Sequence, residues 1–147
     1  MLGDESPLVK RTIAKGIIGV ESHLNSREIL RGLPKLFDED PLVFEYALKW
    51  VPVDLWTLSD MDSMKEGVRK LKNRIHSGEK WRMTVEKRRY SLHHKIEVIR
   101  ELADLIHEEV DLKNPEKIIR VDIIGRYAGM SVLKPTDIFS LAHPLGP

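Results

Sequence analysis

Three consecutive cations, Lys87-Arg88-Arg89, stand between a short alternating run and a stretch of apolar residues with helical period. A guanidinium group can bind two phosphate oxygens at once, and an ammonium group binds as a point charge, so three such groups in a row can contact successive phosphates. Arg82 in the alternating run and Lys95 in the apolar stretch extend this set. The chemistry that this spacing predicts is the binding of a polyanion.

The cations are concentrated in one quarter of the chain. Residues 65–100 hold twelve of the 24 Lys and Arg residues but only four of the 23 Asp and Glu residues, so this segment carries +8 and the rest of the chain carries −7. A stripe of this kind releases counterions when it neutralises phosphates, which favours nucleic acid as the partner. The alternative interpretation is a solvated helix face, because Lys and Arg are common on surface helices.

The sequence contains no motif for catalysis, metal binding or cofactor binding. Because Cys is absent, a disulfide framework, a thiolate nucleophile and a Cys-ligated zinc site are excluded. The six His residues form no HExxH motif, and the adjacent pair His93-His94 would diverge by about 100° on a helix. No Walker A, GxSxG or GxGxxG motif occurs. We therefore expect a protein that is not an enzyme and that holds no metal or cofactor.

Length and hydropathy limit the class of protein. With 147 residues the chain can form one domain, or two small ones that share an interface. Residues 1–12 lack the apolar segment of a signal peptide, and no stretch approaches the roughly twenty apolar residues of a membrane span. We expect a cytoplasmic protein that does not contact a membrane.

The N-terminal part predicts strand, helix and strand. Residues 12–20 are rich in β-branched residues, and Asn25 or Ser26 can then cap a helix over residues 27–37. Pro34 should end or kink that helix. An acidic turn at residues 38–41 leads to a strand over residues 42–50, which should stop at Pro52.

The basic segment itself predicts helix, strand and helix. Ser59-Asp60 can cap a helix over about residues 61–75, and the next strand runs into Lys87-Arg88-Arg89. Ser91 is expected to cap the longest helix, over residues 92–110. The apolar residues expected in the core of these elements are Met64, Val68, Leu71 and Ile75 of the first helix, Trp81, Met83 and Val85 of the strand, and a stripe of Leu92, Ile96, Ile99, Ala103 and Ile106 on the second helix that Val98, Leu102 and Leu105 widen.

Two more strands complete the expected fold. Ile119, Val121 and Ile123 alternate with other residues, and a turn at residues 125–129 leads to a last strand over residues 130–133. The tail from Pro135 is expected to be irregular. The order β-α-β-α-β-α-β-β predicts an α/β fold with helices packed on a mixed β-sheet.

Several runs of residues carry a resemblance to a known family. The runs VEKRRYSLHHKIEVIRELADLI (85–106), VDLKNPEKIIRVDII (110–124) and GMSVL (129–133) resemble the THUMP domain, a tRNA-binding module. More narrowly, they resemble the stand-alone THUMP proteins that serve as adaptors for tRNA cytidine acetylation. KWVPVDL (49–55) is similar to an RLLPV-type segment of this family, and GIIGVESHLNSREILRGL (16–33) resembles part of the ferredoxin-like module that precedes THUMP domains.

The resemblance implies a partial ferredoxin-like module over residues 1–59 and a THUMP domain over residues 60–147. It also implies that the chain grips the acceptor stem and 3′ end of tRNA while a separate cytidine acetyltransferase performs the chemistry. A-form RNA hides its base edges in a deep groove, so recognition is expected through phosphates, 2′-hydroxyls and the single-stranded end. Two alternatives stay open. The chain could serve another tRNA-modifying enzyme, in methylation or thiolation, or its basic face could bind an acidic protein.

The expected RNA-binding residues are nine cations and one serine of the basic segment: Arg69, Lys72, Arg74, Lys80, Arg82, Lys87, Arg88, Arg89, Ser91 and Lys95. The N-terminal amides of the helix after Ser91 are expected to add donors and the positive end of a dipole. Tyr90 is expected to pack rather than to stack on a base, because an aromatic residue between a strand and an apolar helix is more often buried.

Overall fold

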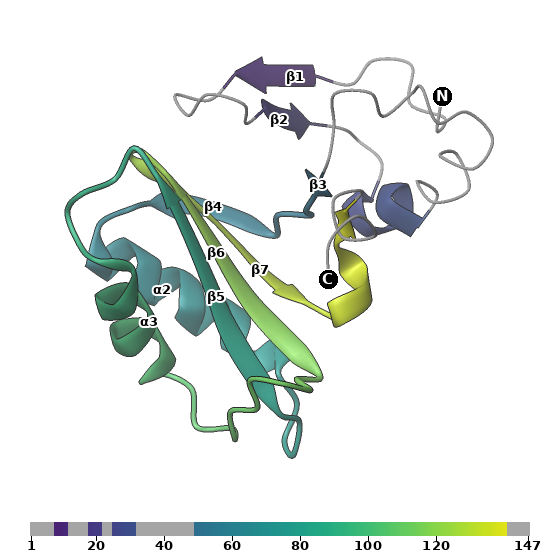
Figure 1. Ribbon diagram of the computed structural model, residues 1–147, viewed down its shortest axis with the longest axis vertical. Coiled ribbons are helices and arrows are strands. Elements are labelled where there is room, and N and C mark those ends of the chain that lie inside the picture. The colour runs from purple at the N-terminus through teal and green to yellow at the C-terminus, as the bar shows by residue number, and fades with distance from the viewer. Residues whose placement is uncertain (1–7, 12–17, 22–24, 32–48, 141–147) are drawn as a thin grey trace. The chain divides into compact units, whose positions relative to one another are not determined.

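The computed structural model describes residues 8–11, 18–21, 25–31 and 49–140 (Figure 1). The chain divides into two compact units, of which the larger contains Val53–Pro135 and the smaller contains Ile18–Pro52 and Thr136–Pro147. The expected division into modules over residues 1–59 and 60–147 stays a prediction. Among the described residues, no helix combines the length and the apolar character needed to cross a bilayer.

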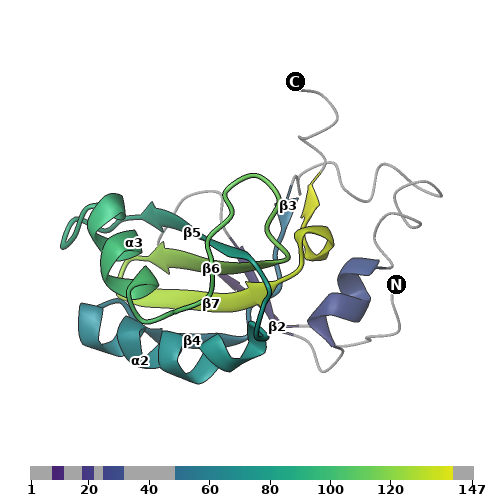
Figure 2. The same cartoon turned by 90° about the horizontal axis from the view of Figure 1, so that it is seen from below.

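The larger unit is a mixed four-stranded sheet with helices on one face. The strands are β4 (Leu55–Leu58), β5 (Trp81–Arg88), β6 (Lys117–Ile124) and β7 (Tyr127–Leu133), in the order β4-β7-β6-β5. β5 and β6 are parallel, whereas β7 is antiparallel to β4 and to β6. Helix α2 (Met61–Leu71) packs on β4 and β7, and α3 (Lys95–Ala103) packs on β5 (Figures 1 and 2). The predicted α/β class with a mixed sheet is confirmed.

The core lies between the sheet and the two helices. Trp81, Met83 and Val85 are buried while the residues between them are partly exposed, so the predicted alternation of β5 is confirmed. The register places Met83 beside Ile119 and Val85 beside Val121, and β6 buries the same face. The indole N–H of Trp81 donates to the carbonyl of Glu108 at 2.8 Å, which satisfies its polar atom inside the core.

Helix α2 begins at the predicted cap. Asp60 accepts the N–H of Ser63 at 2.9 Å through Oδ2, and the predicted apolar stripe of Met64, Val68 and Leu71 is buried. The regular helix ends at Leu71 and continues as a 3-10 turn over Lys72–Arg74, so it is shorter than predicted. Gly78 has φ 86°, a conformation that costs glycine nothing, and it reverses the chain toward β5.

Helix α3 starts later and ends earlier than predicted, and the expectation that Ser91 caps it is wrong. Its first residue is Lys95, and the Oε1 atom of Glu97 accepts the N–H of His94 at 3.3 Å. His94 is therefore the N-cap residue, three positions beyond Ser91. The helix ends at Ala103 and spans nine residues, against eleven in α2, so it is not the longest helix.

The predicted stripe of α3 is also shifted. Val98 and Leu102 are fully buried and form the centre of the packed face, whereas Leu92 is 65% exposed and Ile96 is 60% exposed. Leu92 lies before the helix, because the helix starts at Lys95. Ile96 lies on the flank of the helix and not beneath it. Apolar residues therefore cover more of α3 than the sheet can bury.

Two features near β7 differ from the expectation. Strand β4 was not predicted, because it has only four residues and follows Pro52 closely. Its residues alternate between half-buried and exposed. The turn before β7 is shorter than predicted: Gly125, with φ 59°, and Arg126 connect β6 to β7, which already begins at Tyr127. The register of this hairpin pairs Ile124 with Tyr127.

In the residues that the structure describes, the smaller unit shows two short sheets and one helical segment. β1 (Leu8–Arg11) pairs with β2 (Ile18–Glu21), and β3 (Lys49–Trp50) pairs antiparallel with β8 (Phe139–Ser140). A 3-10 turn over Pro135–Asp137 precedes β8, so the described part of the tail is not irregular as expected, and residues 141–147 lie outside the described residues.

Residues 26–31 are helical, and the Oδ1 atom of Asn25 accepts the N–H groups of Arg27 at 2.9 Å and Glu28 at 3.2 Å, as predicted for a cap. The other parts of the N-terminal expectation, residues 12–17, 32–37, 38–41 and 42–48, lie outside the described residues.

The shifted stripe leads to a stability prediction. Leu102→Ala removes a fully buried side chain and should lower the free energy of unfolding by about 2–5 kcal/mol, because the cavity cannot collapse completely. Ile96→Ala, at an exposed position of the same helix, should cost less than about 0.5 kcal/mol. Chemical denaturation of both variants measures the difference. Equal losses would contradict the packed face assigned to α3.

Candidate nucleic-acid interface

Three segments meet at the carboxyl end of β5 through the buried residue Ser59. Its N–H donates to the carbonyl of Arg126 at 2.9 Å, and its hydroxyl donates to the carbonyl of Gly125 at 2.8 Å. Its own carbonyl accepts the hydroxyl of Tyr90 at 2.8 Å. Gly125 in turn donates its N–H to the carbonyl of Arg88 at 2.9 Å. The start of α2, the β6–β7 turn and the segment after β5 are thereby tied together.

The cations on these segments form what we call the strand-end cluster: Lys87, Arg88, Arg89 and Arg126. Arg88, Arg89 and Arg126 are exposed. Lys87 is half-buried and donates from Nζ to the carbonyl of His93 at 3.3 Å. Burial of Arg88 or Arg89 was the structural alternative to a role in binding, and the exposure of both argues against it.

Arg126 and its neighbour Tyr127 were not among the expected site residues. Arg126 is the second residue of the β6–β7 turn and follows Gly125, whose N–H donates to the carbonyl of Arg88, and Tyr127 is 54% exposed. A cation followed by an aromatic residue in a glycine-bounded turn, GRYAG, was the signal in the sequence. An exposed aromatic ring next to cations is the combination that binds single-stranded nucleic acid.

Tyr90 is packed, as expected. It contacts the hydrophobic core, is half-buried, and uses its hydroxyl to hold Ser59. Burial, followed by the nearby charges of Asp60 and Glu97, raises the pKa of the Tyr90 phenol. The Tyr90 hydroxyl therefore stays protonated and can donate its hydrogen bond to the carbonyl of Ser59, which is a structural role.

Ser91 and Lys95 occupy different positions from those expected. Ser91 is exposed in the segment before α3. Lys95 is the first residue of α3, and its Nζ lies 3.7 Å from a carboxylate oxygen of Glu86 on β5. This ion pair is exposed on both sides, so it contributes little and does not remove Lys95 from solvent.

The other five expected cations lie at the opposite end of β5, in what we call the strand-start cluster: Arg69, Lys72, Arg74, Lys80 and Arg82. The first three lie on the end of α2 and the 3-10 turn, and the last two lie before and at the start of β5. Seven residue steps of a strand separate Trp81 from Arg88, or about 23 Å. The expected residues therefore form two clusters and not one.

Several members of the strand-start cluster already have partners. Arg69 pairs with Glu66 at 3.1 Å, and Arg74 pairs with the largely buried Asp54 at 3.2 Å. One terminal N–H of Arg82 donates to the carbonyl of Leu112 at 3.0 Å, while its Nε atom is enclosed without a partner among the described residues. Arg74 and Arg82 therefore hold loops of the fold. Lys72 and Lys80 are the members best placed for a ligand.

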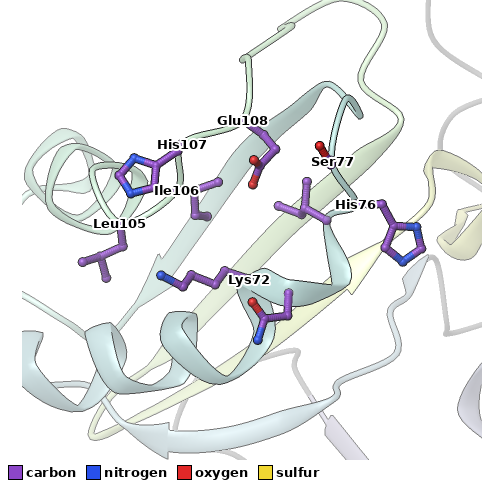
Figure 3. A pocket seen from close by; sticks show the side chains of 9 residues that line it. Lys72, His76, Ser77, Leu105, Ile106, His107 and Glu108 are labelled. Carbon is purple, nitrogen blue, oxygen red and sulfur yellow. The ribbon is translucent and has the colours of Figure 1, made fainter.

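A cavity of about 440 Å³ lies beside this cluster, between the end of α2 and the segment after α3 (Figure 3). Ile75 and Ile106 line its apolar part, and His76 and Glu108 lie on its rim. Figure 3 shows Lys72 reaching from the 3-10 turn toward Leu105 on the opposite wall. In the part of the chain that the structure describes, no group of three or more His, Asp or Glu side chains could hold a metal ion.

The comparisons with known proteins decide the family. The model of the THUMP domain matches residues 59–133, just over half of the chain. The chain belongs to the THUMP domain family. The THUMP domain is an RNA-binding domain of tRNA modification, so the strand-end and strand-start clusters lie on a domain of RNA-binding type. No curated protein matches the chain.

Three solved structures are similar to the chain, and the two with TM-scores above 0.5, PH1313 and TrmN, share its fold. The solution structure of the THUMP domain of THUMP domain-containing protein 1 is 29% identical, with TM-score 0.43, over 48% of this chain and 81% of that chain. PH1313 from Pyrococcus horikoshii Ot3 is 15% identical, with TM-score 0.58, over 87% of this chain. TrmN from Thermus thermophilus is 18% identical, with TM-score 0.52, over 76% of this chain. The chain spans 44% of the length of each of the last two.

The carboxylate at the start of α3 leads to a pH prediction. The hydrogen bond from the His94 N–H lowers the pKa of Glu97, so the folded state favours the ionised form. The stability from this bond is therefore fully present above the unfolded pKa, near 4.5, and is lost as the pH falls through the lower folded pKa. Glu97→Gln should flatten the fall of the thermal midpoint between about pH 5 and pH 3. A parallel fall in the variant would refute this role.

Proposed function

We propose that the chain is a tRNA-binding adaptor without catalytic activity of its own, which presents tRNA to a separate modifying enzyme, a tRNA cytidine acetyltransferase. The observation that carries the proposal is the exposed strand-end cluster on a THUMP domain. Arg88, Arg89 and Arg126 lie on two adjoining segments that Ser59 holds together. All three residues are exposed.

The strand-end cluster suits a phosphate backbone that continues into a single-stranded end. Arginine forks can bind phosphate oxygens in pairs, and each contact releases counterions. Tyr127, exposed next to Arg126, offers a ring on which an unpaired base can stack. The acceptor stem and 3′ end of tRNA combine these two features, and the resemblance of the chain to tRNA-binding adaptors points to the same ligand.

The strand-start cluster offers a second place where the same RNA could be bound. Lys80 directly precedes β5, whose length from Trp81 to Arg88 is about 23 Å, and the strand-end cluster lies at its other end. A rod-like RNA helix can touch both places, whereas a small anion cannot. Binding to both clusters would be recognition of shape and charge, with little reading of base sequence.

The assignment of the enzyme rests on the resemblance of residues 85–133 to the stand-alone THUMP adaptors of cytidine acetylation. A subunit for another tRNA modification, methylation or thiolation, uses the same RNA-binding surface and differs only in the enzyme that it serves. The chemical identity of the modified nucleotide distinguishes an acetyltransferase partner from a methylating or thiolating one.

The strand-end cluster generates a binding prediction. Arg88→Ala/Arg89→Ala should weaken tRNA binding at least tenfold and should lower the slope of log K against log salt by about two units, because two phosphate contacts are lost. The thermal midpoint should stay unchanged, because exposed cations contribute little to folding. Filter binding over a salt series and a thermal melt measure both quantities.

The matched control is Arg100→Ala/Lys113→Ala, which removes two exposed cations that belong to neither cluster. It should leave both the salt slope and the thermal midpoint nearly unchanged. Full tRNA affinity in a folded Arg88/Arg89 variant would remove the strand-end cluster from the interface.

The enzyme assignment generates a second prediction. Cells that lack this chain should lose acetylated cytidine from their tRNA while other modified nucleotides persist, because the enzyme no longer receives its substrate. Wild-type chain should restore the acetylated nucleotide, and the Arg88/Arg89 variant should not. Mass spectrometry of digested tRNA gives the answer. Loss of a methylated or thiolated nucleotide instead would favour the alternative enzyme.

A further inference from the structure

One long side of the THUMP sheet is an open edge formed by β5. β6 pairs with β5 on one side only. The backbone groups of Trp81 point away from β6. Its N–H donates to the carbonyl of Glu109 at 3.0 Å, and its carbonyl accepts the N–H of Asp111 at 2.9 Å. Backbone direction alternates along a strand, so Met83, Val85 and Lys87 turn their N–H and C=O groups the same way. Within the described part of the chain, these groups have no backbone partner.

An apolar flank of α3 borders this edge. Glu101 pairs with Lys65 of α2 at 3.0 Å, so that side of α3 faces α2. Successive helical residues differ by about 100°, which puts Ile96, Ile99 and Ala103 on the opposite flank. Ile96 is 60% exposed although it is aliphatic. The open strand edge and the exposed aliphatic flank are therefore neighbours on the same side of the domain.

We propose that this side binds a second copy of the chain, with the two β5 strands antiparallel about a twofold axis at Val85. The three outward positions are symmetric about Val85, so Met83 of one copy lies opposite Lys87 of the other. Each open N–H then meets an open C=O, and the two four-stranded sheets join into one. The twofold axis also brings the Ile96 flanks of the two α3 helices together, which is the self-complementary contact that a C2 dimer requires.

The chemistry of the edge favours a polypeptide over RNA as the occupant. An open strand edge offers donors and acceptors in a fixed alternation, and another extended peptide strand repeats that alternation at the same spacing. Phosphate oxygens accept hydrogen bonds but donate none. The ends of the edge also fit a copy of β5. The chain leaves the strand at Arg89, whose φ is 55°, and so leaves room for the segment around Val110 that already occupies the edge at Trp81.

Charges on the opposite face of the sheet set the conditions for this dimer. The register puts Arg88 of one copy opposite Arg82 of the other, with Glu86 on the diagonal, so like charges oppose the contact at low salt. The ion pair of Lys95 and Glu86 lies at the edge, and the two side chains must move apart when a second strand pairs there. Breaking this pair costs little free energy because both side chains are exposed. Dimerisation should therefore strengthen as salt screens the arginines.

Pairing would also change the basic surface. In one chain the two clusters are about 23 Å apart along β5. In the antiparallel dimer, the strand-end cluster of one copy adjoins the strand-start cluster of the other, and two continuous basic surfaces result. The proposal concerns association of the chain with itself, so it stands or falls independently of the enzyme assigned above.

Sedimentation equilibrium of the full chain tests the proposal. The average mass should rise with concentration from 17.0 kDa toward twice that value, and the association should be tighter at about 0.5 M salt than at about 0.05 M. Ile96→Lys should return the mass to that of one chain. Leu58→Lys, at a similarly exposed leucine on the other edge strand, β4, is the matched control and should dimerise normally.

Cross-linking tests the register itself. The chain has no Cys, so Thr84→Cys/Glu86→Cys introduces the only thiols, and each should face its counterpart across the axis and give a disulfide-linked dimer. Trp56→Cys/Leu58→Cys on β4 should give none. A single-chain mass at every concentration and both salts would overturn the proposal. So would dissociation by Leu58→Lys instead of Ile96→Lys.

Discussion

The hydrogen bonds of Ser59 connect three segments of the THUMP unit and fix their positions relative to one another. A buried polar group that loses its partner costs about 1–3 kcal/mol, so a serine that is 6% exposed must satisfy its N–H, hydroxyl and carbonyl inside the protein. It does so with Arg126, Gly125 and Tyr90, which belong to two loops far apart in the sequence. The same residue precedes the cap of α2 at Asp60. Ser59 thus positions the start of α2, the β6–β7 turn and the segment that carries Arg89. The exposed cations of the strand-end cluster lie on the last two of these segments.

Strand β5 determines how the charge is distributed. Its buried face, with Trp81, Met83 and Val85, belongs to the core, so the strand cannot bend to bring its two ends together. Cations before and after it are held about 23 Å apart. Counting charges therefore overstates the binding surface, because Arg74 and Arg82 are engaged with Asp54 and with the carbonyl of Leu112. A cation that holds a loop is less available to release counterions than its charge alone suggests.

Much of this fold could be predicted from local pattern. Alternation in β5 and β6 and the stripe of Met64, Val68 and Leu71 in α2 are properties of short windows, and the structure confirms them. The start of α3 could not be predicted in this way, because Ser91 and His94 both precede apolar residues and only the bond between Glu97 and His94 decides between them. Strand β4 has four residues, too few for a periodic signal. The separation of the cations into two clusters, and the position of Arg126 beside Arg88, depend on strand register, which no local pattern contains.

The excess of apolar residues on α3 links these observations. A helix that packs on a sheet needs one apolar stripe, and Val98 and Leu102 already provide it. Ile96 then adds an exposed aliphatic side chain on the flank of the helix, which folding of one chain does not bury. Natural sheets usually protect an open edge with charge, and here the exposed ion pair of Lys95 with Glu86 is joined by Arg82 and Arg88 of β5 itself. Salt screens such charges, so this edge beside an apolar flank favours a contact that opens and closes over a surface that only faces water. Because the arginines on either side oppose that contact until they are screened, binding of a polyanion and the proposed pairing of the edges would be coupled through the same charges.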